Sequence, residues 1–132
     1  MPTDAMNTYV DVNEKRLGLK GYDPVAYFQV GRPQAGSPDY TFNYEGVKYR
    51  FASRQNLILF MKDPERYLPA YGGFCSFGVS EGLKLDTDPA AFKIVDGKLY
   101  LNNCMEIHDK WLGEQERIER ANKNWPDVLT KE

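Results

Sequence analysis

The sequence predicts an α+β fold made of two antiparallel β-hairpins, short helices and a C-terminal helix. Two segments of alternating apolar and polar residues each fold back on a two-residue turn. An amphipathic segment follows the first of them, and another closes the chain. Because the strands come as adjacent antiparallel pairs and not as βαβ units, we expect no parallel sheet.

The first predicted hairpin covers residues 40–51 and turns at Glu45-Gly46. One face should be aromatic and buried, while the polar residues between the apolar ones face solvent. The expected cross-strand pairs are Tyr44 with Val47, Phe42 with Tyr49, and Tyr40 with Phe51.

A helix should follow at once, because Ser53 is a good N-cap and Leu57, Phe60 and Met61 form an apolar stripe. Asp-Pro pairs at positions 23–24, 63–64 and 88–89 combine a capping residue with a first-turn proline. Short helices are therefore predicted to begin at these three places.

The second predicted hairpin covers residues 92–101 and turns at Asp96-Gly97, with Phe92 and Ile94 opposite Leu101 and Leu99. A closing helix should run from about Cys104 to Trp125, with a break at Gly113. Both hairpins are expected to share one core with this helix. Its inward residues are predicted to be Ile107, Trp111, Ile118, Ala121 and Trp125.

The 132 residues suit one domain, predicted as residues 17–132 after a leader at 1–16. The net charge of −2, with no basic stripe, argues against nucleic acid as a partner. No apolar run is long enough for a transmembrane segment. The composition does not single out a protein partner.

A glycine-rich loop, residues 71–82, carries Cys75 at its centre. It is interpreted either as a purely structural loop or as a place where the backbone approaches a ligand. The candidate ligand loop consists of Tyr71, Gly72, Gly73, Phe74 and Cys75.

Cys104 and His108 are one helical turn apart, so both could face one ion together with Cys75. Two thiols and an imidazole suit copper or zinc. The alternative is a buried thiol with an imidazole at the edge of the apolar stripe. As a nucleophile and base, Cys75 and the chain's one histidine are a weak signal, so we predict no catalytic residues and no enzyme.

Four segments in order resemble the YHS-domain family: residues 21–28 (GYDPVAYF), 48–53 (KYRFAS), 63–67 (DPERY) and 71–75 (YGGFC). Residues 96–102 and 124–126 look like a bacterial branch of that family. Many members of this branch resemble exported or lipid-anchored proteins, which implies an extracytoplasmic or periplasmic location.

The resemblance implies a treble-clef-like core in which metal-binding members carry three cysteines. This sequence has Ala26, Ala52 and Asn56 at those positions, and Glu45 in place of a histidine, although Ser53 is kept. The family's metal site is therefore expected to be missing or to have moved to Cys75.

These observations favour a non-catalytic YHS-like domain that binds a small ligand or a soft metal ion near Cys75, or acts as an interaction module. The alternative is a thiol-dependent redox or metal-handling protein that uses Cys75 and Cys104.

Overall fold

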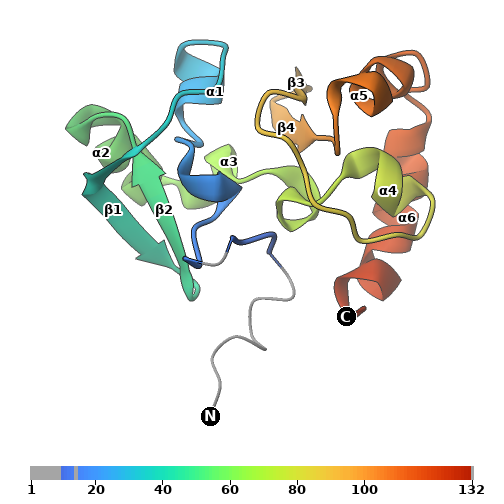
Figure 1. Ribbon diagram of the computed structural model, residues 1–132, viewed down its shortest axis with the longest axis horizontal. Helices are drawn as coiled ribbons and strands as arrows, with labels where there is room; N and C mark the ends of the chain where they lie inside the picture. The colour runs from blue at the N-terminus through green and yellow to red at the C-terminus, as the bar shows by residue number, and fades with distance from the viewer. Residues whose placement is uncertain (1–9, 14, 132) are drawn as a thin grey trace.

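The computed structural model describes residues 10–13 and 15–131 of the chain. Figure 1 shows two groups of elements side by side, one around each hairpin. The expected leader, residues 1–16, lies mostly outside the described residues. Within the described part, no helix is long and apolar enough to cross a membrane.

The first group follows the chain from its start to the middle. Its elements are η2 (Leu19–Gly21), α1 (Ala26–Gln29), β1 (Ser37–Tyr44), β2 (Val47–Phe51), α2 (Arg54–Lys62) and α3 (Pro64–Tyr67). The second group holds η3 (Ala70–Gly73), α4 (Ser76–Ser80), β3 (Phe92–Val95), β4 (Lys98–Leu101), α5 (Met105–Leu112) and α6 (Arg117–Leu129). The predicted α+β class is confirmed.

The register of the first hairpin is as predicted only near its turn. The two predicted pairs closest to Glu45-Gly46 form, but Phe51 pairs with Ser37 and not with Tyr40. The predicted third pair is therefore wrong. The strand shifts register around Pro38, which has no amide hydrogen for the ladder.

Helix α2 begins as predicted, because the Ser53 hydroxyl accepts a 3.1 Å hydrogen bond from the amide of Asn56. Leu57 and Phe60 pack against the first hairpin. The inward placement of Met61 is wrong, since its side chain is 51% exposed. The next residue of a helix lies about 100° around the axis, and the hairpin covers only the side of Phe60.

Helices follow two of the three Asp-Pro pairs, those at Asp23 and Asp63. The helix predicted at Asp88 is wrong: its carboxylate accepts a 2.9 Å hydrogen bond from the amide of Ala90 and forms a turn. Strand β3 begins at Phe92, so too few residues remain there for a helix.

The second hairpin has the predicted register, with Phe92 opposite Leu101 and Ile94 opposite Leu99. The predicted break at Gly113 is also confirmed, because α5 ends at the residue before it.

The predicted shared core is wrong, because the buried residues form separate clusters. Phe51 of the first hairpin packs with Phe60, whereas Trp111 packs with Tyr100 in the second group. A third cluster joins Tyr27 of α1 to the inner residues of the second hairpin. The core therefore consists of three clusters, and the third of them bridges the two groups of elements.

Candidate functional site

Ala26, Ala52 and Asn56, the three positions where the family resemblance implies cysteines in metal-binding members, converge on one buried carboxylate, that of Asp23. Its Oδ2 accepts hydrogen bonds from the Ala52 amide (2.8 Å) and the Asn56 side chain (2.7 Å). Its Oδ1 accepts from the amides of Val25 (2.8 Å) and Ala26 (3.2 Å).

All four contacts point N–H groups at Asp23, and N–H groups cannot ligate a cation. Asp23 itself is fully buried. The residues at these positions therefore do not fit a soft metal ion. They fit an anion, and the protein supplies one from its own chain.

The Cys75 thiol is fully buried and lies at the centre of a second polar cluster. Its Sγ accepts hydrogen bonds from the amides of Gly78 (3.3 Å) and Asn103 (3.2 Å). The thiol donates in turn to Oδ1 of Asn102 at 3.6 Å. Burial raises the pKa of Cys75, and the hydrogen bonds from the backbone oppose this only in part.

Asn102 joins Cys75 to His108. The amide of Phe77 donates a 2.9 Å hydrogen bond to Asn102 Oδ1, which turns Nδ2 of Asn102 toward Nδ1 of His108 at 3.3 Å. Nδ1 of His108 then accepts a hydrogen bond from Nδ2 of Asn102, so the neutral ring carries its hydrogen on Nε2. Burial lowers the pKa of His108 and favours this neutral form.

His108 was expected at the edge of the apolar stripe, but it is buried and its ring stacks on Trp111 with centroids 6.1 Å apart. Cys104 is the N-cap residue of α5 and is partly exposed. In the described ranges, no group of three or more His, Cys, Asp or Glu side chains is arranged to hold a metal ion. A three-ligand site at Cys75, Cys104 and His108 stays a prediction.

The loop that leads to Cys75 has an unusual backbone. Tyr71, Gly72 and Gly73 all have positive φ, at 58°, 61° and 86°. Tyr71 is held there because its buried hydroxyl donates a 2.8 Å hydrogen bond to Asn122 Oδ1. Its ring also contacts Trp125 edge to face, with centroids 5.8 Å apart.

Gly72 of this loop opens onto a groove of about 250 Å³ between the two groups of elements. Glu45 at the tip of the first hairpin and Glu65 of α3 line the groove. Lys98, beside the tip of the second hairpin, and Trp125 of α6 line it as well. The groove therefore joins the turns of both hairpins to the candidate ligand loop.

Sequence reasoning named Cys75 and His108 but missed Asp23 and Asn102 as polar centres. Asp23 could have been found, since it precedes a proline inside the family-like segment. No local signal marks Asn102, whose partner Cys75 lies 27 positions away.

These features define a small α+β domain whose hairpin and helix are tied together by a buried carboxylate. Residues 22–71 match the family model of the YHS domain. No curated protein and no solved structure gives a significant match.

Proposed function

We propose that this protein is a non-catalytic binding module that takes a small dipolar ligand in the groove beside the Cys75 loop. The observation that carries the proposal is the groove itself, about 250 Å³ in volume. Pockets of a few hundred cubic ångströms with a few polar groups are the usual form of small-molecule sites.

The charges around the groove set the kind of ligand. In the described part of the chain, neither the Glu45 nor the Lys98 side chain has a hydrogen-bond or ion-pair partner. Glu65 already accepts a 2.6 Å hydrogen bond from the hydroxyl of Tyr44. A ligand with a cationic and an anionic end, such as a free amino acid, could pair with Glu45 and Lys98 at once.

Trp125 supplies an apolar surface for the rest of such a ligand. It is half-buried, and its ring contacts Tyr71 and Phe74 of the candidate ligand loop. Binding would therefore touch the loop through Trp125 without direct contact with the Cys75 thiol.

The test is a thermal-shift screen with free amino acids and betaines, followed by titration of each hit against tryptophan fluorescence. We expect Glu45→Gln and Lys98→Gln each to weaken binding of a hit about tenfold, the usual loss of one charged contact. Lys123→Gln, an exposed lysine of the same helix as Trp125, is the matched control and should bind like the parent. Equal affinity in all three variants would refute the groove as the site.

A second candidate is a soft metal ion, copper or zinc, at Cys75 and His108 with Cys104 as third ligand. The observation that favours it is the single amide of Asn102 between Cys75 and His108. A soft ion could replace this amide if Asn102 turned away.

Elemental analysis of protein purified without chelator tests this candidate. Copper or zinc that is present in the parent and lost in Cys75→Ser and His108→Gln would support it. Metal absent from the parent, and no binding on titration with zinc or Cu(I), would exclude it. The thiol-dependent redox alternative is less well supported, because the thiolate is the reactive form and burial raises the pKa of Cys75.

A further inference from the structure

The segment of residues 83–88, here named the strap, runs beside the backbone of Cys75. The amide of Cys75 donates a 2.9 Å hydrogen bond to the carbonyl of Leu85. The hydroxyl of Thr87 donates a 2.8 Å hydrogen bond to the carbonyl of Gly73. The amide of Asp88 donates a 3.0 Å hydrogen bond to the carbonyl of Asn102. The strap thus binds the elements on both sides of Cys75.

The strap is not held by apolar packing alone, because Leu83 is 50% exposed and Leu85 is 39% exposed. Lys84 anchors it to the end of α6, where its Nζ donates to the carbonyls of Leu129 (3.0 Å) and Lys131 (2.7 Å). The side-chain amide of Asn103 donates a 2.9 Å hydrogen bond to the carbonyl of Asp86. The side chain of Asp86 faces Lys20, in the opposite group of elements.

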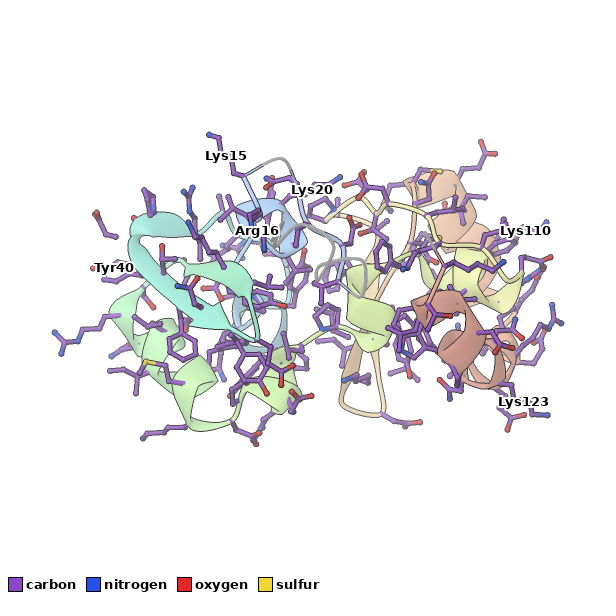
Figure 2. All side chains as sticks on the ribbon, turned by 90° about the horizontal axis from the view of Figure 1, so that it is seen from below. Lys15, Arg16, Lys20, Tyr40, Lys110 and Lys123 are labelled. Carbon is purple, nitrogen blue, oxygen red and sulfur yellow. The ribbon has the colours of Figure 1, made fainter. Side chains whose placement is uncertain are left out.

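Asp86 lies beside a second carboxyl group, that of Asp11. The pKa values of the two carboxyl groups shift in opposite directions, as expected for a pair in which one group carries the proton of a shared hydrogen bond. Lys20 of η2 donates a 2.7 Å hydrogen bond to Asp86, and Figure 2 places Lys20 between the two groups of elements, far from Lys110 and Lys123.

Asp11 also ties the strap to the candidate ligand loop. Its amide donates a 2.9 Å hydrogen bond to the carbonyl of Gly72, and its carboxyl group lies 3.5 Å from the hydroxyl of Thr87. A cavity of about 10 Å³, room for one water molecule, lies beside these groups and is lined by Leu19 and Leu101 as well. Asp11 and Lys20 are the titratable side chains that line it.

We propose that the strap is a pH-controlled cover for Cys75, closed while the Asp11–Asp86 pair shares one proton and loosened when both carboxyl groups are ionised. With both ionised, two negative charges meet in a partly buried place, where Lys20 and the backbone amide of Thr87 offset them in part. Repulsion then acts on Asp86, in the middle of the strap.

The pH range follows from the two groups. Burial, followed by the hydrogen bond to Asp86 and its charge, raises the pKa of Asp11 from 3.8 to about 8. The hydrogen bond from Asp11 is the main cause that lowers the pKa of Asp86 to about 2. The closed strap therefore holds one extra proton, and this stabilisation is lost as pH rises from about 4 through 8.

The experiment uses the full chain with Cys104→Ser, so that Cys75 is the remaining thiol. Its rate of reaction with 4,4′-dithiodipyridine is measured at pH 5.5 and pH 8 in this parent and in Asp11→Asn, which keeps a hydrogen-bonding group but cannot ionise. Dividing the parent rate by the Asp11→Asn rate at each pH removes the ordinary ionisation of the thiol. We expect this ratio to rise about tenfold or more from pH 5.5 to pH 8.

Asp39→Asn, an exposed carboxylate of β1, is the control and should keep the pH dependence of the parent. A ratio that stays constant with pH would overturn the proposal. Trypsin cleavage after Lys84 in the protein with both cysteines is a second readout, analysed in the same way. If cleavage at Lys48 and Lys123 rises in parallel, the whole chain unfolds and the strap is not the moving part.

This inference does not depend on what the groove binds. If the strap is pH-dependent but the protein binds no amino acid or metal, the strap proposal holds and the binding proposal fails. If the protein binds a ligand but the strap is pH-independent, the strap proposal fails.

Discussion

The side-chain amide of Asn56 donates a 2.7 Å hydrogen bond to the carboxylate of Asp23, 33 positions earlier in the chain. This contact fastens α2 to the segment before α1, and the amide of Ala52 completes it from the end of β2. The family resemblance implies that, in members with a metal site, a cation is held by thiolates at the positions of Ala26, Ala52 and Asn56. In this protein the central group is negatively charged, and it accepts hydrogen bonds from the N–H groups around it.

Asp23→Asn should lower the free energy of unfolding by about 2–4 kcal/mol, because an amide turns one N–H₂ group toward donors that need an acceptor. Asp39→Asn, an exposed carboxylate, should change it by less than about 0.5 kcal/mol. Urea unfolding followed by circular dichroism gives both values. If the two variants are equally stable, the Asp23 cluster does not hold the domain together.

The aromatic cores supply the next test. Phe51→Ala and Trp111→Ala should each cost about 3–5 kcal/mol, because both side chains are fully buried, one in each half of the molecule. Met61→Ala, with the parent side chain 51% exposed, is the control and should have little effect. A small loss at Phe51 or Trp111 would contradict the corresponding core.

Sequence reasoning succeeded where the signal is local. Both hairpin tips were predicted from two residues each, and all four residues have positive φ, as such turns require. The N-cap at Ser53 and the break at Gly113 are local signals of the same kind.

It failed where distant residues decide the outcome. The bulge that displaces Tyr40 depends on how β1 meets β2 beyond the turn, and the turn at Asp88 depends on where β3 begins. The candidate site was predicted only in part for the same reason. Cys75 and His108 are conspicuous residue types, but Asn102 connects them through contacts that no spacing in the sequence reveals.

Acid should destabilise the protein through His108. Burial lowers the pKa of its imidazole below the ordinary value of 6.5, so the stability it contributes is present above pH 6.5 and is lost as pH falls through the lowered pKa. His108→Gln keeps a polar side chain without this titration. We expect the free energy of unfolding to fall more steeply from pH 7 to pH 5 in the parent than in the variant, as measured by urea unfolding. Parallel pH curves would show that His108 is not held neutral by the fold.

High pH should destabilise the protein through Cys75, just as low pH does through His108. Burial raises the pKa of the thiol above its ordinary value of 9.0. The stability that the protonated thiol contributes to the fold is therefore fully present below pH 9 and is lost as pH rises through the raised pKa. Cys75→Ala cannot titrate, and its stability should decline less between pH 8.5 and pH 10.5 than that of the parent. Cys104→Ser, at the partly exposed cysteine, is the matched control and should follow the parent.

Thiol counting at pH 6 separates a structural from a reactive Cys75 in the native protein. Cys104 is partly exposed, whereas the Cys75 thiol is fully buried, donates to Asn102 and lies under the strap. We therefore expect one thiol to react quickly with 4,4′-dithiodipyridine and the second to react only in denaturant, since access and the thiolate fraction both limit the rate. In Cys104→Ser the fast phase should disappear, and in Cys75→Ser it should persist unchanged. A fast phase that survives in Cys104→Ser would mean that Cys75 is accessible and would restore the thiol-dependent function as the leading proposal.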